Sequence, residues 1–473
     1  MNLNHVLTAI DDWMYTYILI ILLIACGVYF TVRCGFAQLR FIKDAFRVLK
    51  EKAQQDQDGH KKVSSFQALM ISTASRVGTG NIAGIATALV AGGPGAVFWM
   101  WLMAIIGGAS AFVESTLAQI YKVPDGKQFR GGPSYYIQIG MGKRWLGVVF
   151  SILLICCFAY GFNGLQAFNM SSALEYYIPN YAQTIWPAVV GALLAAATGL
   201  VIFGGVKRIG FITSVLVPIM AGAYILVGLY TMVTRFDRLP EVIAMIFQEA
   251  FDFQAIFGGF VGSAVLIGIK KGLFSNEAGM GSAPNASATA QVSHPVKQGL
   301  VQVLSVFIDT LLICSTTAFL LLLSGVEGKP GQLDGIPYVQ AAISENVGTW
   351  GIHFITLSIF AFAFSSLIGN YYYAESNILF IKDNQTVLNA FRCTCLVAIF
   401  LGAQADFTTI WSIADILMGC MAIVNIFALF CLGGVAVNAL HDYQEQRRRG
   451  LDPVFRASNI GLTNTKVWKD DES

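Results

Sequence analysis

Hydrophobic residues in this chain fall into long runs that are separated by polar loops. A helix that crosses a bilayer needs about 20 predominantly apolar residues, because no water in the hydrocarbon can pair with exposed backbone groups. We draw about eleven spans of this kind, at residues 13–32, 64–91, 96–121, 145–173, 185–203, 209–233, 256–269, 299–323, 350–380, 387–401 and 408–432. The pattern predicts an all-α polytopic membrane protein.

The second span is interrupted at its centre by glycines and polar residues, with the sequence RVGTGN at residues 76–81. Glycine weakens a helix interior by about 1 kcal/mol relative to alanine. Any backbone group that a break releases must find a partner inside the membrane. We therefore expect a helix that is broken at mid-membrane depth, where bare backbone groups can hold a small solute or an ion.

Positive charges gather in alternate loops, which fixes the expected orientation. Cytoplasmic loops of membrane proteins carry an excess of Lys and Arg, so the N-terminus is predicted outside and the C-terminus in the cytoplasm. Arg235, Arg238 and Lys329 are the few exceptions. The residues on which the prediction rests are Arg33, Arg40, Lys43, Arg47, Lys50, Lys52, Lys61, Lys62, Lys122, Lys127, Arg130, Lys143, Arg144, Lys207, Arg208, Lys270, Lys271, Lys297, Arg447, Arg448 and Arg449.

The spans divide into one extra helix and two sets of five. Residues 1–63 hold the extra N-terminal span and a basic linker, residues 64–440 form the core, and residues 441–473 form a cytoplasmic tail. Within the core, residues 64–234 and 255–440 begin on opposite sides of the membrane. That arrangement is typical of an inverted repeat in secondary transporters.

The first span of the second repeat, residues 256–269, is also rich in small residues. It contains Gly258, Gly259, Gly262, Ser263 and Gly268. Interrupted segments at matching positions of two repeats point to a transporter's binding site. The alternative is that these glycines only allow close packing between helices.

Composition agrees with a membrane protein and excludes several function classes. Hydrophobic residues make up 55% of the 473 residues, charged residues 12%, and the net charge of +2 gives no reason to expect nucleic-acid binding. The nine cysteines lie mostly in apolar runs without the spacing of a zinc or redox motif. The first apolar run is too long for a cleaved signal peptide and lacks a basic segment before it.

The expected break has the chemistry of an amino-acid and sodium site. The amides of Gly78, Thr79 and Gly80 can receive a carboxylate, with Asn81 as a side-chain partner, while exposed carbonyls suit a hard cation. Ser365 and Ser366 lie at the centre of the ninth span. Hydroxyl oxygens next to carbonyls make the all-oxygen site that sodium prefers.

A polar stripe continues from these serines along one helical face, through Asn370, Tyr373 and Asn377. The alternative reading of this stripe is hydrogen bonding between helices. Another polar cluster contains Asn163, Gln166 and Asn169. We expect Gln166 to accept a substrate ammonium group or to orient Asn81, with a helix-helix hydrogen bond again as the alternative.

Several ionisable residues fall inside the predicted spans, where an unpaired charge is costly. Asp415 should therefore face the protein interior. Glu114 and Asp309 lie on the second spans of the two repeats, and either could neutralise Arg76. A structural ion pair and a role in coupling are both open for these residues.

Two longer motifs resemble those of a known transporter family. Residues 92–101 read GGPGAVFWMW, and residues 274–284 read FSNEAGMGSAP, a strip that follows Lys270 and Lys271 and is expected to form an inner gate on the cytoplasmic side. Together with the broken second span, they resemble the signatures of the sodium:alanine symporters, the alanine or glycine:cation symporter family. The resemblance covers nearly the whole chain.

The resemblance implies a LeuT-type 5+5 inverted repeat with one additional N-terminal helix. By position, the carbonyls of Ala74 and Val77 and the hydroxyls of Ser365 and Ser366 would hold sodium. The substrate would lie against Gly78, Thr79, Gly80 and Asn81, with Gln166, Ser366 and Asn370 closing the pocket. Many relatives have tryptophan where this chain has Asn370 and proline where it has Val424, which leaves the substrate preference open.

The expected function is sodium-coupled uptake of small neutral amino acids across the cell membrane, with alanine or glycine as substrate. Glutamine, asparagine or serine carriage is the alternative, and proton coupling through Glu114 or Asp309 is a weaker one. A channel would show a pore motif repeated across subunits, and an enzyme would need a catalytic constellation that the five histidines do not provide. Sodium is the one expected ion and no other cofactor is implied; the oligomeric state is left open.

Overall fold

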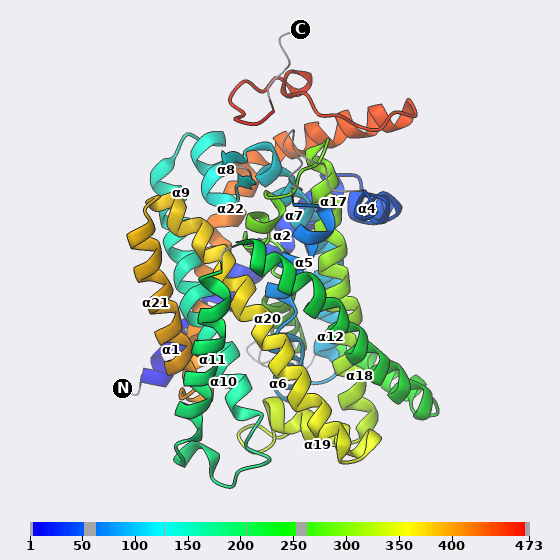
Figure 1. Ribbon diagram of the computed structural model, residues 1–473. Coiled ribbons are helices and arrows are strands. Elements are labelled where there is room, and N and C mark those ends of the chain that lie inside the picture. The colour runs from blue at the N-terminus through cyan, green and yellow to red at the C-terminus, as the bar shows by residue number, and fades with distance from the viewer. Residues whose placement is uncertain (1–2, 52–62, 127, 205, 252–262, 469–473) are drawn as a thin grey trace.

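The protein is a bundle of α-helices with one two-stranded antiparallel sheet, as the computed structural model shows (Figure 1). The structure describes residues 3–51, 63–126, 128–204, 206–251 and 263–468. Its first half contains α1 (Leu3–Met14), η1 (Tyr15–Leu19), α2 (Ile20–Arg33), α3 (Ala37–Arg40), α4 (Ile42–Leu49), α5 (Ser65–Arg76), η2 (Thr79–Asn81), α6 (Ala83–Gly92), α7 (Gly95–Ile120), β1 (Val123–Asp125), β2 (Gln128–Arg130), α8 (Pro133–Gly140), α9 (Arg144–Leu154), η3 (Ile155–Phe162), α10 (Asn163–Ser172), η4 (Tyr181–Gln183), α11 (Trp186–Ile202) and α12 (Val206–Thr234).

The second half contains α13 (Leu239–Ala250), α15 (Ala264–Asn276), α16 (Pro284–Ser287), α17 (Pro295–Phe307), η5 (Ile308–Cys314), α18 (Ser315–Ser324), α19 (Gly335–Val347), α20 (Trp350–Ile381), α21 (Gln385–Gly402), α22 (Phe407–Arg448) and η6 (Ala457–Ile460). In the sheet, Val123 pairs with Arg130 and Asp125 with Gln128. Three elements, η1, η3 and η5, are π-helical segments inside longer helices. Such segments often occur at functional sites because they rotate the side chains that follow.

Eight helices of the described chain are long and apolar enough to cross a membrane. They are His5–Arg33, Gly95–Ile120, Arg144–Ser172, Phe211–Thr234, Pro295–Ser324, Trp350–Ile381, Gln385–Gly402 and Phe407–Arg448, and each overlaps one predicted span. Trp186–Ile202 is a shorter apolar helix at the position of the fifth predicted span. The remaining predicted spans, 64–91 and 256–269, are the ones that the sequence marks by glycines.

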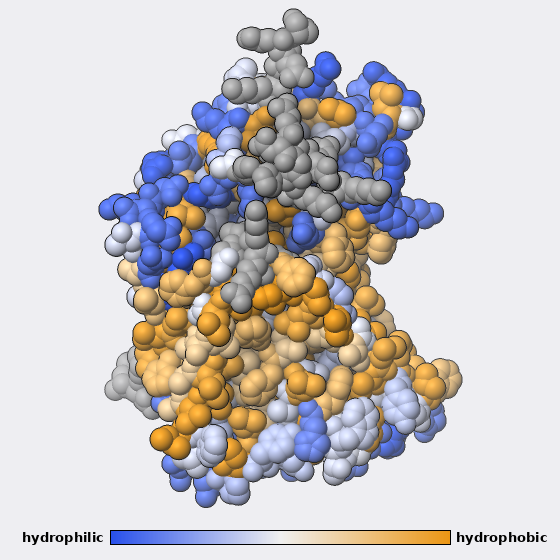
Figure 2. Space-filling model, viewed as in Figure 1, coloured by the Kyte–Doolittle hydropathy of each residue, from blue (hydrophilic) through white to orange (hydrophobic). Residues whose placement is uncertain are grey.

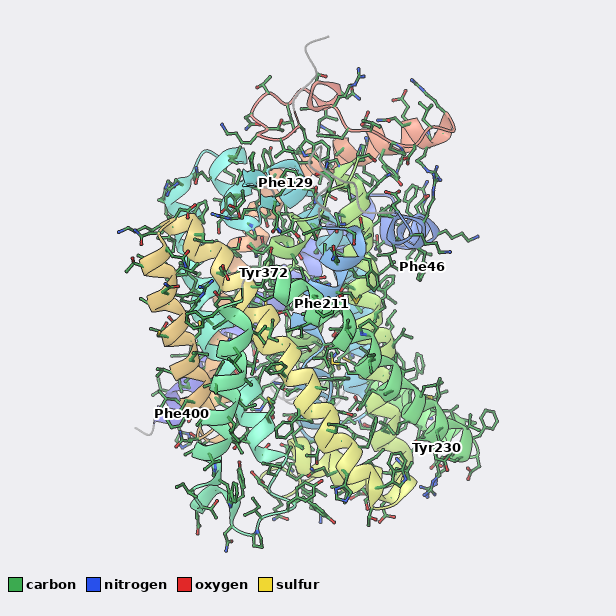
Figure 3. All side chains as sticks on the ribbon, viewed as in Figure 1. Phe46, Phe129, Phe211, Tyr230, Tyr372 and Phe400 are labelled. Carbon is green, nitrogen blue, oxygen red and sulfur yellow. The ribbon has the colours of Figure 1, made fainter. Side chains whose placement is uncertain are left out.

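An apolar band crosses the visible face of the bundle between two polar ends (Figure 2). Large hydrophobic side chains are exposed along the outer helices; Phe211 and Tyr230, for example, lie near the two ends of α12 and are 68% and 56% exposed (Figure 3). Exposed apolar surface of this extent is expected where lipid, rather than water, is the solvent. The structure thus agrees with an integral membrane protein.

The first interruption lies where the sequence predicts it. Ser64 begins α5 with a capping box, in which its hydroxyl accepts from the Gln67 amide and the Gln67 side chain accepts from the Ser64 amide. The helix ends at Arg76, a short 3₁₀ turn follows at Thr79–Asn81, and α6 resumes at Ala83. Every residue from Ala68 to Ile85 is buried, so the break is enclosed by protein.

The predicted second interruption lies largely outside the described residues, which exclude Gly258, Gly259 and Gly262. Ser263 caps the start of α15, directly after these residues, and Gly268 lies within the regular helix. A further irregular segment follows this helix, which ends at Asn276, and it covers residues 277–283 before α16. Glu277 ends α15 in the left-handed conformation, and Gly279 and Gly281 also have positive φ values. Left-handed residues terminate helices because they turn the backbone away from the helical path.

The strip 274–284 is a buried and tightly turned element of the core. Within the irregular segment, the Gly281 amide donates to Glu114 Oε2 at 3.1 Å, and Asn425 Nδ2 donates to the same oxygen at 3.0 Å. Asn425 also donates to the Gly279 carbonyl. The segment is tightly turned, as expected, and α7 and α22 supply the partners that bury it; its role as an inner gate on the cytoplasmic side stays a prediction.

Lys270 and Lys271 are likewise buried helix residues and not loop charges. Lys270 forms ion pairs with Asp11 and, at 2.9 Å, with Asp415, while Lys271 Nζ lies 3.5 Å from Asp415 Oδ2. Their ammonium groups also lie over aromatic rings, Lys270 over Tyr15 and Lys271 over Trp411 at 4.0 Å. Asp415 faces the protein interior, as expected for a carboxylate in an apolar span.

These ion pairs connect the N-terminal segment to the core. Asp11 lies on α1, Asp415 on α22 and the two lysines on α15, and the Tyr15 hydroxyl donates to the Asp415 carbonyl. Two positive and two negative charges balance within the cluster. Buried charges require such pairing because the interior cannot solvate them.

The segment after α22 packs onto the bundle and does not project from it. It lies across the end of the bundle that also carries α4 and α8 (Figure 1). The Phe455 amide donates to the Ser293 carbonyl, and the Trp468 indole donates to the Gln119 carbonyl at 2.8 Å. Lys297 pairs with Asp452 at 3.0 Å and with Glu51 at 2.9 Å.

Replacing Asp415 with alanine should destabilise the protein by about 3–5 kcal/mol, because it leaves Lys271 buried without its anionic partner. The measurement is the free energy of unfolding, or the melting temperature, of detergent-solubilised protein. A matched control is Glu445→Ala, which removes the exposed pair with Arg449 and should cost less than about 1 kcal/mol. Equal effects of the two variants would contradict a structural role for the buried cluster.

Candidate functional site

The break in α5 is held open by side chains that bond its backbone. Gly78 has an extended conformation with φ −130° and ψ −154°, which carries the chain out of the helix. Its amide donates to Asn81 Oδ1 at 3.0 Å, and the Asn81 carbonyl accepts from the Thr317 hydroxyl. The break therefore has a fixed shape in which its backbone groups are directed at specific partners.

Four oxygens meet at the last turn of α5. Ser366 Oγ donates to the Ala74 carbonyl at 3.0 Å and lies 3.4 Å from the Val77 carbonyl. Ser365 Oγ lies 3.5 Å from the same Ala74 carbonyl and donates to the Phe362 carbonyl at 2.8 Å. The structure thus brings together all four residues that the sequence assigned to sodium. Phe362, which sequence reasoning missed, adds a fifth oxygen next to them.

Gln166 and Asn169 contact the other side of the break. Gln166 Oε1 accepts from the Thr79 amide at 3.0 Å, and Asn169 Nδ2 donates to the Thr79 hydroxyl at 2.9 Å. Both side chains lie on α10, directly after the π-helical segment η3. Gln166 therefore reaches the break, but its partner is the Thr79 amide and not Asn81; its expected contact with a substrate ammonium group stays a prediction.

Asn81 connects the break to the second half of the chain. Its Nδ2 donates to Asp309 Oδ1 at 2.6 Å and to Ser275 Oγ at 3.0 Å. The other Asp309 oxygen accepts from Ser275 and Thr310, at 2.6 and 3.0 Å. Asp309 is fully buried, and three neutral donors stabilise its carboxylate.

Gly80 faces an aromatic wall that sequence reasoning did not assign to the site. A Cβ atom at Gly80 would lie 2.4 Å from a ring carbon of Phe274, so the ring rests directly on the backbone. The Phe274 ring contacts Phe162 at 4.9 Å and Trp411 at 5.1 Å between centroids. Phe274 belongs to the recognised motif at residues 274–284, which was the available signal.

Asn370 is held in a polar chain across the bundle. Ser75 Oγ donates to Asn370 Oδ1 at 2.7 Å, and Asn370 Nδ2 donates to Asn163 Oδ1 at 3.0 Å. Ser75 Oγ also lies 3.1 Å from Glu277 Oε1. Asn370 thus links α5, α10 and α20, one turn from the serine pair, and both polar atoms of its amide bond protein partners.

Arg76 does not form the expected ion pair. Its guanidinium donates to Gln302 Oε1 at 3.3 Å and is in no ion pair with an acidic residue of the described chain. Glu114 bonds the second interruption, and Asp309 bonds Asn81 and two hydroxyls. Neutral donors make the direct contacts to both carboxylates, and Arg76 attracts Glu114 and Asp309 only from beyond ion-pair distance.

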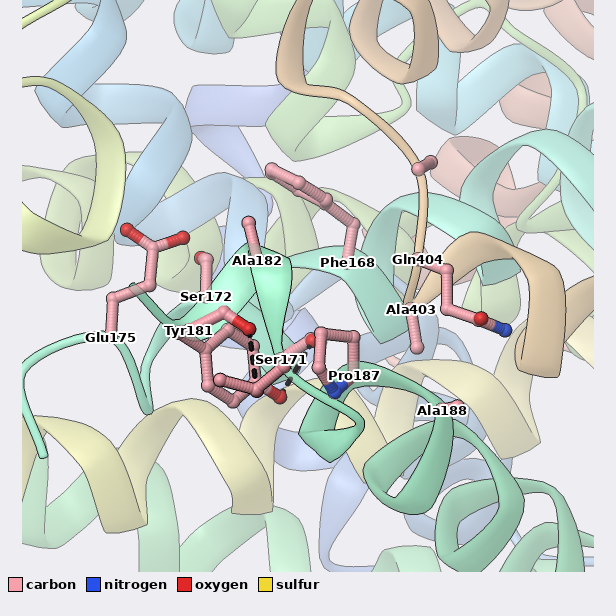
Figure 4. A pocket seen from close by; sticks show the side chains of 12 residues that line it. Phe168, Ser171, Ser172, Glu175, Tyr181, Ala182, Pro187, Ala188, Ala403 and Gln404 are labelled. Atoms are coloured by element: carbon pink, nitrogen blue, oxygen red, sulfur yellow. Dashed lines mark hydrogen bonds between the residues drawn. The ribbon is translucent and has the colours of Figure 1, made fainter. Parts of the chain in front are cut away.

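Two adjoining cavities lead toward the break from the end of the bundle where α10 ends. One has a volume of about 300 Å³ and is lined by Phe168, Asn169, Asp334 and Phe407. The other, of about 220 Å³, shares Phe168, Ser172 and Glu175 with it and is seen in Figure 4. Burial raises the pKa of both the Glu175 and the Asp334 carboxyl above its usual value. Asn169 lines the first cavity and bonds the Thr79 hydroxyl. One side chain therefore separates this cavity from the break.

Comparison with known proteins identifies the family. The profile of the sodium:alanine symporter family matches residues 1–457. The chain belongs to this family of transporters. Both motifs, at residues 92–101 and 274–284, lie within the matched residues.

Curated relatives match this symporter over nearly its whole length. The amino-acid carrier protein AlsT of Bacillus subtilis is 48% identical, with 99% of this chain and 98% of the relative covered. A probable sodium/glutamine symporter of the same organism, GlnT, is 46% identical over 96% of this chain and 93% of the relative. The sodium/alanine symporter AgcS of Methanococcus maripaludis is 34% identical over 95% and 99%.

Solved structures show the fold of this symporter. The structure of MhsT in complex with L-phenylalanine superposes with a TM-score of 0.54 at 15% identity and covers 88% of this chain and 94% of that chain. A manganese transporter from Eremococcus coleocola gives a TM-score of 0.52 at 14% identity, over 86% and 81%. This similarity supports a LeuT-like transporter fold and says nothing about the substrate.

Replacing Gly80 with alanine should lower substrate affinity at least about ten-fold, since the new Cβ must displace the Phe274 ring from the break. A valine at this position should abolish binding. The measurement is equilibrium binding of labelled amino acid to purified protein. The control is Gly84→Ala, one turn further along, whose Cβ would make an ordinary 3.5 Å contact with Trp411. Unchanged binding by Gly80→Ala would remove this surface from the site.

Proposed function

We propose that this chain is a sodium-coupled symporter that carries small neutral amino acids, alanine or glycine, into the cell by alternating access. The proposal rests on one observation: groups that suit a cation and groups that suit a carboxylate lie side by side at the break after α5. Carbonyl and hydroxyl oxygens converge on one side of Gly78, and amide groups face the other side. Membership of a transporter family supports this chemistry over that of an enzyme.

In this proposal, sodium binds to the carbonyls of Ala74 and Val77 and the hydroxyls of Ser365 and Ser366. The residues fit a hard cation, because each of these oxygens lies within 3.5 Å of another and none belongs to a charged group. The Phe362 carbonyl is the neighbouring candidate for a further ligand. Sodium supplies the driving force, since the inward gradient and the membrane potential favour its entry.

The amino acid lies at Gly78, Thr79, Gly80 and Asn81, with its carboxylate on the amides that now donate to side-chain oxygens. Helix termini favour such anions because unpaired N–H groups and the helix dipole point at them. Gln166, Ser366 and Asn370 bound the pocket. The Phe274 ring over Gly80 limits the space for a substrate side chain, which favours small amino acids.

For the membrane arrangement, we propose two inverted repeats, 64–234 and 255–440, after an additional N-terminal helix in residues 1–63. The interruption between α5 and α6, at the start of the first repeat, supports this division, as does the LeuT-like fold. In this arrangement the N-terminus lies outside and the tail, 441–473, lies in the cytoplasm. The protein is located in the inner membrane of the cell. A monomer contains all the residues of the proposed site.

Glutamine is the second candidate substrate, with asparagine and serine as related possibilities. It is favoured by the 46% identity to a relative named as a probable sodium/glutamine symporter. The resemblance implies a bulky indole at the position of Asn370 in many relatives, so Asn370 would leave more space near the serine pair.

Uptake into proteoliposomes tests the proposal. Labelled alanine should accumulate in a saturable manner under an inward sodium gradient, and not when choline replaces sodium. Unlabelled alanine, glycine, serine and glutamine, added as competitors, then rank the substrates. Linear, unsaturable flux would contradict a carrier mechanism, and uptake driven equally by a proton gradient in sodium-free buffer would contradict sodium coupling.

Replacing Ser366 with alanine should raise the sodium concentration for half-maximal uptake about ten-fold or more, because the cation loses one of its oxygen ligands. Ser365→Ala should act in the same direction. Ser358→Ala is the matched control, a serine two turns earlier on α20 and outside the oxygen cluster. If the serine pair and Ser358 gave the same sodium dependence as the unmodified protein, the pair would not belong to the ion site.

A further inference from the structure

The side chain of Gln166 occupies the position that the proposed function gives to the substrate carboxylate. Its carboxamide oxygen accepts from the Thr79 amide at 3.0 Å, with the geometry of a hydrogen bond to a carboxylate oxygen. Gln166 is 3% exposed and comes from α10, a different helix from the break. Substrate cannot bond the Thr79 amide until this oxygen has moved away.

The same carboxamide lies next to the proposed sodium site. A Cβ atom at Gly78 would lie 2.4 Å from Ser366 Oγ and 3.0 Å from both Gln166 Nε2 and Gln166 Oε1. The hydroxyl and the carboxamide therefore both border the space that glycine leaves empty. This close approach explains glycine at position 78, since the backbone there is extended and open to any residue.

Sodium binding changes which acceptor the Ser366 hydroxyl can use. In this structure the Ser366 hydroxyl donates to the Ala74 carbonyl at 3.0 Å. When hydroxyl and carbonyl oxygens both bind the same cation, their lone pairs point at the cation, and a proton between them is repelled by its charge. The hydroxyl proton must then turn to another acceptor. On the same helix, the Phe362 carbonyl already accepts a hydrogen bond from Ser365. The other nearby acceptor is the Gln166 carboxamide oxygen, which borders the same space at Gly78.

We infer that Gln166 is the positioning residue that couples sodium to substrate. Without sodium, its carboxamide oxygen accepts the hydrogen bond of the Thr79 amide and so keeps the substrate carboxylate from bonding there. With sodium bound, the Ser366 hydroxyl turns to Gln166 Oε1 and draws it away from Thr79, which frees the amide for the substrate carboxylate. This inference rests on the proposed function, and it adds the physical step by which one ligand favours the other. Coupling of this kind typically changes affinity by about 5- to 150-fold.

Three variants test the role. Gln166→Leu keeps the approximate volume and removes the hydrogen bond, so the amide is free whether or not sodium is present. Gln166→Glu places a carboxylate at the same position, and a charged acceptor holds the Thr79 amide more strongly. Gln340→Leu is the matched control, because Gln340 is a buried glutamine that bonds Ala173 and Thr356 away from the break.

The measurement is the Kd of labelled alanine for each purified, folded variant in sodium and in choline buffer at equal ionic strength. The unmodified protein and Gln340→Leu should bind alanine at least about five-fold more tightly in sodium. For Gln166→Leu the two Kd values should converge, with binding in choline becoming tighter. For Gln166→Glu, alanine binding in sodium should weaken about ten-fold or more.

The possible contrary results separate the alternatives. Loss of alanine binding by folded Gln166→Leu in both buffers, together with tighter binding by Gln166→Glu, would make Gln166 a direct ligand of the substrate ammonium and overturn the coupling role. An unchanged sodium effect in Gln166→Leu would overturn it as well. If the unmodified protein bound alanine equally in both buffers, the proposed function itself would fail, and the coupling role with it.

Discussion

The requirement that every backbone group inside the membrane has a partner governs this structure. A helix satisfies the requirement by itself, and α5 gives up that advantage at Gly78. The released groups are then bonded by side chains from other helices: Ser366 at the carbonyls of Ala74 and Val77, Gln166 at the Thr79 amide, and Thr317 at the Asn81 carbonyl. Each of these helices is thereby fixed relative to the break. Because sodium and substrate would replace some of these bonds, ligand binding is directly connected to helix packing.

Buried charge is the second constraint, and the protein meets it in two ways. Lys270 and Lys271 are balanced by Asp11 and Asp415, which anchors the N-terminal segment against α15 and α22. Glu114 and Asp309 are instead stabilised by neutral donors, several of which lie in the interrupted segments. The charged cluster favours one fixed arrangement. The neutral hydrogen bonds can exchange partners at lower cost, which suits segments that move during alternating access.

Sequence reasoning predicted the elements well and the partners less well. Apolar runs located the long helices, and glycines between polar residues located the break at Gly78, because both signals are local. The break predicted near Gly262 falls at the edge of the described residues and stays a prediction. The shape of the irregular segment after α15 depends on the left-handed Glu277 and on Glu114 and Asn425, which lie far away in sequence. The loop assignment of Lys270 and Lys271 failed for the same reason, as their acidic partners lie on other helices.

The sequence by itself determined that the chain is a helical membrane protein, that its second span is broken at Gly78, and which family it resembles. It also grouped Ala74, Val77, Ser365 and Ser366 through that resemblance. Only the tertiary structure decided that Gln166 bonds the Thr79 amide, that Phe274 covers Gly80, and that Asn370 spans from Ser75 to Asn163. Periodicity and composition indicate whether a side chain prefers water, lipid or the protein interior. Which donor meets which acceptor depends on helix packing, because residues 87 to 295 positions apart become neighbours only when the bundle has formed.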